Sequence, residues 1–204
     1  FYEPAYYLHH IVEMLLPIKQ DTSGHWHIVG YEGLASHGGV IGIIVAIILY
    51  CRRYKVNIMR VLDNMGIVAP LSAAFIRIGN LFNSEIVGLP TNMPWGFVFA
   101  HNGETFARHP AQLYEAVCYA ILFCATLFVY KKRQDKIGTG FFFGLCLTVI
   151  FTLRIVIEFL KDNQVSFENG MPLNMGQILS IPLVIIGIYC IKHGKWCQKL
   201  SEKK

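Results

Sequence analysis

The sequence predicts an all-α fold, a polytopic integral membrane bundle of about five transmembrane helices. The composition is apolar, because 54% of the 204 residues are hydrophobic and only 15% are charged, whereas charged residues make up about 25% of a typical soluble domain. Several apolar runs approach the roughly 20 residues that a helix needs to cross a bilayer. In addition, lysine and arginine gather in alternate loops, as they do in membrane proteins of fixed orientation.

Five segments are predicted to cross the membrane as helices. In chain order they are residues 33–51, 58–83, 110–130, 138–160 and 176–191. The first, third and fourth have suitable length and hydropathy, and the last is somewhat shorter. The second has only a short apolar centre, residues 66–76, with polar residues on both sides. Hydropathy alone therefore leaves the second segment undecided.

The distribution of positive charge decides that case. If all the segments cross, nearly all loop lysines and arginines fall on one side, in the groups at 52–60, 131–136 and 192–204. If residues 58–83 do not cross, this bias collapses. The positive-inside rule then places that side, and with it the C-terminus, in the cytoplasm. The net charge of +5 is explained by this topology, so no nucleic-acid partner is expected.

Ionisable residues within the predicted spans are the first candidates for a site. A charged side chain at mid-bilayer costs about 2.5–3.5 kcal/mol on insertion scales. Arg154 and Glu158 are four residues apart, so they share a helical face and can form an ion pair. They either fix helix packing or border a polar cavity. Arg77, Asn80 and Ser84 also recur at helical spacing, and an arginine beside an amide is suited to holding a phosphate.

Two span beginnings carry further polar residues. His37 is followed by two glycines at the start of the first span, and a histidine there is a candidate base or a helix-capping residue. Gln112 and Glu115 follow Pro110 in the first turns of the third span. They are candidate site residues or ordinary interface residues. On these grounds alone, a transporter or channel with an intramembrane polar site and a structural membrane protein both stay open as alternatives.

These clusters together resemble one family, the bacterial prolipoprotein diacylglyceryl transferases. The matching segments occur in the family's order, and five such motifs in order are specific. They are SHGGVIG at 36–42, RIGNLFNSEIVG at 77–88, RHPAQLYE at 108–115, RIVIE at 154–158 and NMGQILSIP at 174–182. The chain departs from the pattern at Ile76 and Ser84, where the family often has glycine. The family typically has seven spans, and because this chain begins at Phe1 without an HWYGL-like stretch, we expect an N-terminally truncated sequence.

The resemblance implies a transferase of the bacterial inner (cytoplasmic) membrane. Its reaction moves the diacylglyceryl group of phosphatidylglycerol to the thiol of the lipobox cysteine of a preprolipoprotein, forming a thioether and releasing glycerol phosphate. This is the first step of lipoprotein maturation, and it implies neither a metal nor an organic cofactor. The expected organisation is a periplasmic arm with an interfacial helix at 1–32, a transmembrane catalytic domain at 33–193 and a basic cytoplasmic tail at 194–204.

The same resemblance suggests roles for individual residues. The anionic leaving group must be stabilised where water is scarce, which we assign to Arg77, Asn80 and Arg154, with Glu158 orienting Arg154. A free thiol has a pKa near 8.5 and reacts as the thiolate, so His37 is the expected proton acceptor. The expected catalytic residues are thus His37, Arg77 and Arg154. The remaining expected substrate-binding residues, which shape or support the site, are Asn80, Asn83, Glu85, Gly88, His109, Gln112, Glu115 and Glu158.

Overall fold

The structure is a computed structural model that describes residues 18–20, 25–28, 36–162 and 173–194. It divides into two compact units, Phe1–Tyr54 and Lys55–Lys204, and each is described by itself. The first unit contains an antiparallel hairpin of β1 (Ile18–Gln20) and β2 (Trp26–Ile28), in which Lys19 pairs with His27. It also contains the helix α3 (Ser36–Tyr54). The predicted interfacial helix of the arm lies outside the described residues.

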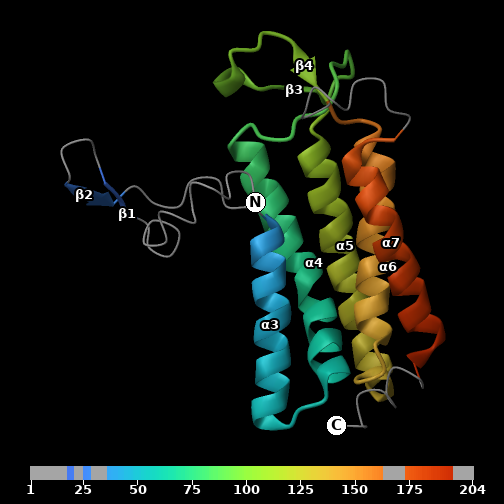
Figure 1. The fold of residues 1–204 in the computed structure, drawn as a ribbon. Coiled ribbons are helices and arrows are strands. Elements are labelled where there is room, and N and C mark those ends of the chain that lie inside the picture. Colours follow the sequence, from blue (N-terminus) through green and yellow to red (C-terminus); the bar gives the residue numbers. More distant parts are fainter. Residues whose placement is uncertain (1–17, 21–24, 29–35, 163–172, 195–204) are drawn as a thin grey trace. The chain divides into compact units, whose positions relative to one another are not determined.

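The second unit is built from four long helices, α4 (Ile58–Phe82), α5 (Ala111–Lys132), α6 (Phe141–Glu158) and α7 (Met175–Lys192). They run alternately up and down (Figure 1). All four are long and apolar enough to cross a membrane. Four of the five predicted spans are therefore confirmed as candidate membrane helices, including residues 58–83, which hydropathy had left undecided. The remaining predicted span, residues 33–51, overlaps the helix α3 (Ser36–Tyr54), and its crossing stays a prediction.

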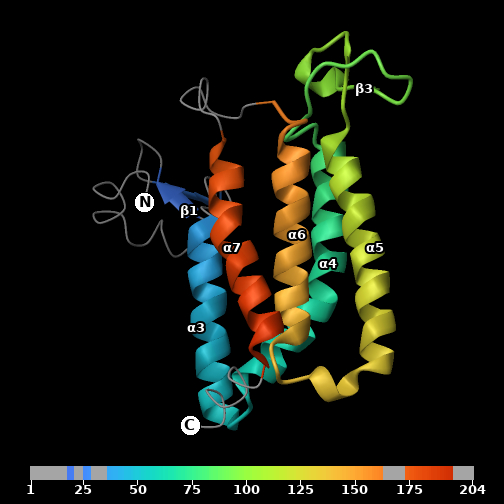
Figure 2. The same ribbon diagram turned by 90° about the vertical axis from the view of Figure 1, so that its right-hand side faces the viewer.

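Helix α6 is the central helix of the second unit, because it contacts α7, α4 and α5, as the turned view in Figure 2 also shows. The contact between α6 and α7 is close because glycines face each other. A Cβ added to Gly144 would lie 2.6 Å from the carbonyl oxygen of Gly187. Lipid chains are as apolar as leucine, so membrane helices associate through such close packing of small residues.

A buried carboxylate on α4 holds the beginning of α6, which lies at the lower end of the bundle in Figure 1. Asp63 is fully buried and accepts hydrogen bonds from the backbone N–H groups of Gly138 (2.8 Å), Gly140 (2.9 Å) and Phe143 (3.0 Å). The first N–H groups of a helix have no partner within the helix, and a negative charge there also complements the helix dipole. Asp63 therefore fastens the start of α6 to α4, although the sequence had shown it only as a flanking polar residue.

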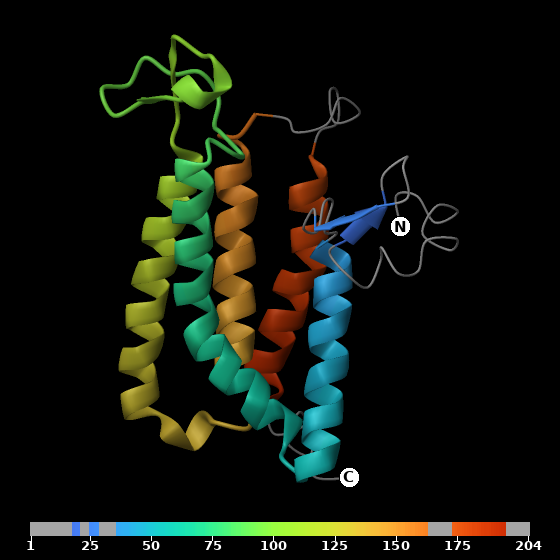
Figure 3. The same cartoon turned by 90° about the vertical axis from the view of Figure 1, so that its left-hand side faces the viewer.

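The upper end of the bundle, where α4 and α6 end and α5 and α7 begin, carries the long connection between α4 and α5 (Figure 3). This connection contains an antiparallel pair of short strands, β3 (Phe97–Val98) and β4 (Ala107–Arg108). A single 3-10 turn, η1 (Ala100–Asn102), lies between them, and another, η2 (Gln134–Lys136), joins α5 to α6. Isolated bridges pair Gly88 with Lys161 and Pro90 with Arg108. The first bridge ties the connection to the chain just after α6, and the second joins two parts of the connection to each other.

Candidate functional site

A chain of buried ion pairs lies at the upper end of the bundle. Glu115 on α5 has no exposed surface, and its Oε2 lies 2.8 Å from Nε of Arg77 on α4. Its Oε1 lies 3.2 Å from Nζ of Lys161, just beyond the end of α6. The same Nζ lies 2.9 Å from Oε2 of Glu158, the last residue of α6. We call these four residues, together with Arg154, the ionic cluster.

The side chains of this cluster are largely buried, so each charge relies on its ionic partner in place of water for stabilisation. The side chain of Lys161 is 2% exposed and that of Arg77 is 15% exposed. Removing one partner of a buried ion pair typically costs about 3–5 kcal/mol, because the remaining charge has no counter-ion. Replacing such pairs by apolar residues is often neutral or stabilising, so helix packing alone does not require them. Their presence marks this end of the bundle as the candidate site.

The expected ion pair between Arg154 and Glu158 does not form between these two described residues, which corrects the sequence interpretation. Glu158 pairs with Lys161 instead, because the turn after α6 brings that ammonium group to the carboxylate. The Nε atom of Arg154 is buried and has no hydrogen-bond partner among the described residues. Arg154 nevertheless belongs to the same region, since it lies on α6 one helical turn before Glu158. Tyr119 lies there too, because its hydroxyl donates a 3.4 Å hydrogen bond to Glu115 Oε1.

A second set of polar contacts joins the end of α4 to the cluster. Arg77 Nη1 donates to Asn80 Oδ1 at 3.4 Å, and Asn80 Nδ2 donates to Glu85 Oε2 at 2.7 Å. The fully buried Gln112 donates from Nε2 to the backbone oxygen of Glu85. The structure therefore brings together the predicted residues from the segments 77–88 and 108–115, through contacts between α4, α5 and the connection that joins them.

Two residues of the segment that follows α4, Ser84 and Ile86, have a positive φ, and a third, Gly88, is tightly enclosed. Ser84 has a φ of 57°, in the left-handed region that glycine adopts without steric cost. The family resemblance led us to expect glycine at this position, where this chain carries serine, and the positive φ gives a physical reason for that expectation. Gly88 has a different reason, because an added Cβ would clash with the backbone oxygen of His109 and lie 2.9 Å from that of Leu160.

The close approach at Gly88 brings three segments together. Gly88 N–H donates to the backbone oxygen of His109 at 3.1 Å, and Arg108 Nη1 donates to the backbone oxygen of Gly88 at 3.1 Å. Arg108 also pairs with Glu104 Oε2 (2.7 Å) and Asp162 Oδ2 (2.9 Å). The hydrogen bond from Arg108 to Glu104 and the nearby Asp162 raise the pKa of Arg108 above its ordinary value. Arg108 therefore stays charged and fastens the connection to the end of α6.

His109 and Asn83 take peripheral places. His109 Nδ1 lies 3.1 Å from the hydroxyl of Tyr114, and that hydroxyl accepts a 2.9 Å hydrogen bond from Trp95 Nε1. The supporting role assigned to His109 stays a prediction. Asn83 ends α4, where its backbone N–H bonds to Gly79, and its side chain is exposed. Its side chain lies outside the contacts described for the ionic cluster.

His37 cannot be placed against the ionic cluster. It lies in the first turn of α3, in the other unit, and its side chain is outside the described residues. Its role as proton acceptor therefore stays a prediction.

Lys161 is a residue of the ionic cluster that the sequence interpretation did not single out, because it lies just after the predicted span at residues 138–160. Its spacing of three residues from Glu158 would have indicated the pairing. Tyr119 follows Glu115 by four residues on the same helix face, and this spacing would likewise have indicated a contact between the two side chains. Neither residue lies within the five segments that resemble the family.

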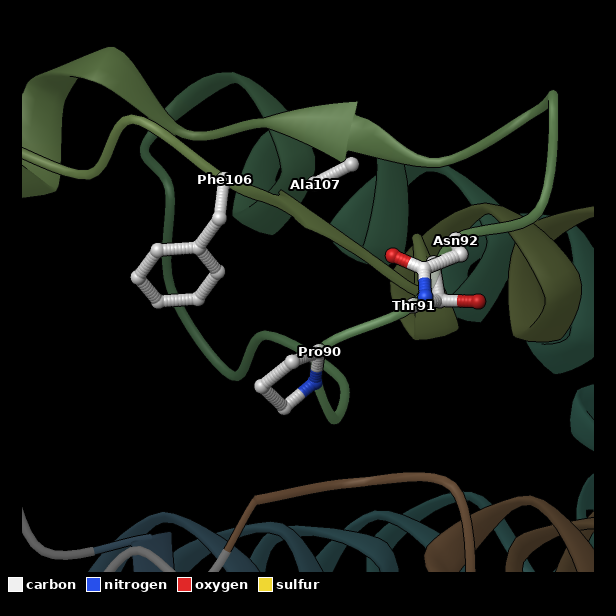
Figure 4. Close-up of a pocket in the computed structure, with 5 residues that line it drawn as sticks. All are labelled: Pro90, Thr91, Asn92, Phe106 and Ala107. Carbon is white, nitrogen blue, oxygen red and sulfur yellow. The ribbon is translucent and has the colours of Figure 1, made fainter.

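An open pocket of about 430 Å³ lies in the connection above the bundle. Its lining residues come from two facing segments, as Figure 4 shows, and are Pro90, Thr91, Asn92, Phe106 and Ala107. None of them is ionisable, so the pocket offers no charge to an anionic ligand, and the ionic cluster remains the candidate site. Within the described part of the chain, His, Cys, Asp and Glu form no group of three or more that could hold a metal ion.

Known proteins similar to this chain agree on one family. Residues 1–192 match the family model described as prolipoprotein diacylglyceryl transferase. A relative from Bacteroides fragilis named phosphatidylglycerol–prolipoprotein diacylglyceryl transferase is 57% identical over 189 residues, covering 93% of this chain and 68% of the relative. Relatives of the same name from Chloroherpeton thalassium and Porphyromonas gingivalis are 43% and 42% identical, covering 94% of this chain and 67% and 68% of their own lengths. This multi-pass membrane chain therefore belongs to the prolipoprotein diacylglyceryl transferase family.

Proposed function

We propose that this protein transfers the diacylglyceryl group of phosphatidylglycerol to the thiol of the lipobox cysteine of preprolipoproteins. A sulfur–carbon bond forms as the carbon–oxygen bond to the phosphate breaks. The electron pair of that bond leaves with glycerol phosphate, and the thiol proton passes to a base. The product is a thioether, and the reaction is the first step of lipoprotein maturation. The observation that carries the proposal is the buried ionic cluster in a chain of this family.

The ionic cluster suits the anionic part of the donor lipid. Arg77 and Arg154 would bind its phosphate, with Asn80 beside Arg77. Fixed cations in a water-poor site stabilise charge that develops on a leaving group. Buried Glu115 holds Arg77 at 2.8 Å, so the guanidinium group is positioned before the lipid arrives. In the same proposal, Glu85, Gly88, His109 and Gln112 shape the mouth of the site, and Asn83 contributes to substrate binding.

The proposed orientation follows from charge. Lys131, Lys132, Arg133 and Lys136 lie at the lower ends of α5 and α6, and Lys192 lies at the lower end of α7. By the positive-inside rule the lower end and the C-terminus face the cytoplasm, and the ionic cluster faces the periplasm. An exported precursor and the outer-leaflet lipid can both reach that side. We further propose 1–32 as a periplasmic arm, 33–193 as the catalytic domain and 194–204 as a cytoplasmic tail.

The test is transfer of labelled diacylglyceryl from phosphatidylglycerol to a lipobox peptide, in liposomes that contain the protein expressed from its complete gene. A peptide with serine in place of the lipobox cysteine is the control. We expect transfer that depends on both the cysteine and the phosphatidylglycerol. Folded protein without transfer would refute the proposal. Nothing in the described residues favours the alternative of a transporter or channel.

A further inference from the structure

Glu158 has two cations within reach along its own segment of chain. Arg154 precedes it by four residues and Lys161 follows it by three, and both spacings bring side chains together on a helix surface. Of these two pairs of described residues, the structure forms the one with Lys161, whose Nζ lies 2.9 Å from Glu158 Oε2. The Nε atom of Arg154 is buried without a hydrogen-bond partner among the described residues. The carboxylate is thus occupied by the lysine.

The position of Lys161 is fixed by its backbone as well as by its side chain. Its N–H donates to the backbone oxygen of Glu158 at 3.1 Å, and the residue pairs with Gly88 in a bridge. On either side of Lys161, Leu89 N–H donates to Leu160 at 2.8 Å and Asp162 N–H donates to Val87 at 3.2 Å. The ammonium group therefore has little freedom to leave the two carboxylates that it contacts.

The charges of the ionic cluster do not cancel. The cations are Arg77, Arg154 and Lys161, and the carboxylates are Glu115 and Glu158, so one positive charge remains in excess. An uncompensated buried charge is costly. A phosphodiester carries one negative charge and accepts strong hydrogen bonds from guanidinium groups. The excess thus matches the charge of a phospholipid phosphate.

We infer that Lys161 is a positioning residue that neutralises Glu115 and Glu158 and so keeps the guanidinium group of Arg154 available to the phosphate of the donor lipid. The inference rests on the proposed function and deepens it. Without Lys161, Glu158 would pair with Arg154 at the helical spacing, and Glu115 would remain with Arg77 alone. The two arginines and the two carboxylates would then cancel, and the anionic lipid would find no free cation.

The test compares Lys161→Met, Lys161→Arg and the double variant Lys161→Met/Glu158→Gln in the transfer assay. Lys192→Met is the control, because it removes an exposed lysine from the lower end of α7. We expect Lys161→Met to raise KM for phosphatidylglycerol about tenfold or more, the typical effect of one charge-assisted contact, with a smaller change in kcat. Lys161→Arg should stay near the wild type. The double variant should recover much of the lost affinity, because a neutral glutamine in place of Glu158 cannot capture Arg154.

Two further measurements keep the inference separate from folding and from the proposed function. The temperature of unfolding shows which variants are folded, and if Lys161→Met is not, the double variant carries the test. Phosphatidylglycerol retained by the purified protein, measured by mass spectrometry, reports binding without catalysis and should fall in Lys161→Met. An unchanged KM in folded Lys161→Met, or a double variant no better than the single one, would overturn the inference. A wild-type protein without transfer would instead refute the proposed function.

Discussion

Arg77 on α4 and Glu115 on α5 form an ion pair of 2.8 Å between Nε and Oε2, and the carboxylate is fully buried. The pair joins two helices that follow each other in the chain but are separated by a long connection. Because Glu115 also contacts Lys161 at 3.2 Å, one carboxylate holds two cations of the ionic cluster. The negative charge of Glu115 therefore holds both Arg77 and Lys161 in place.

Glu115→Gln should destabilise the protein as well as reduce transfer. The substitution leaves Arg77 and Lys161 buried beside a neutral group, and loss of one partner of a buried pair costs about 3–5 kcal/mol. Unfolding in detergent, followed by circular dichroism, measures the loss. Asp135→Asn is the control, because that carboxylate is exposed in η2 and its removal should change stability little. Equal stability of the two variants would contradict this prediction.

Arg154→Ala should have the opposite profile, with transfer lost and stability nearly kept. Among the described residues Arg154 forms no ion pair, and its Nε atom has no hydrogen-bond partner, so we expect the fold to lose little, whereas the proposed phosphate contact disappears. We expect kcat/KM to fall about 100-fold or more, the usual effect of removing one group that stabilises a developing anion. Steady-state kinetics and the unfolding temperature, measured on one preparation, check both parts. Full activity would remove Arg154 from the proposed site.

Two glycines of one motif should respond in opposite directions. Gly88→Ala should disrupt the upper end of the bundle, because its Cβ would clash with His109 and Leu160. Gly79→Ala should be neutral or stabilise the protein by about 0.5–1 kcal/mol, because Gly79 lies inside α4 with nothing within 4 Å of an added Cβ. The unfolding temperatures of the two variants check the contrast, and a stable Gly88→Ala protein would show that the connection can move away.

Asp63→Asn should weaken the lower end of the bundle. The carboxylate accepts hydrogen bonds from three backbone N–H groups at the start of α6, and the amide keeps only one acceptor atom and no charge. Hydrogen bonds to charged groups contribute about 1.5–3 kcal/mol each, so we expect a loss of at least about 2 kcal/mol. Asn64→Ala, at the exposed neighbouring position, is the matched control in the same unfolding experiment. The two variants should differ clearly.

His37→Gln should lower transfer most at neutral pH. If His37 accepts the proton of the lipobox thiol, its loss matters less as the pH approaches the thiol pKa of about 8.5, where the thiolate forms unaided. The ratio of wild-type to variant rate should therefore fall between about pH 7 and 9. Rates with the lipobox peptide across this range measure the ratio. A ratio independent of pH would show that His37 only positions a group.

The sequence by itself determined the class of the protein and the positions of its helices. Apolar length and the alternation of positive charge depend on the chain alone, which is why residues 58–83 were predicted as a span although their apolar centre is short. The structure forms a helix there that is long and apolar enough to cross a membrane. The motifs also indicated that Arg77, Gln112 and Glu115 belong to a site. These properties need no knowledge of which helix faces which.

The tertiary structure decided which charges meet. The helical spacing allowed Arg154 and Glu158 to pair, but the turn after α6 brings Lys161 to that carboxylate instead. Likewise, Asp63 became a cap for α6, and Glu115 became the link between α4 and the end of α6, only through helix packing. A buried charge takes the partner that the packed backbone places nearest, because desolvation makes an unpaired charge costly. Sequence spacing gives the possible partners, and only the packing of the helices selects among them.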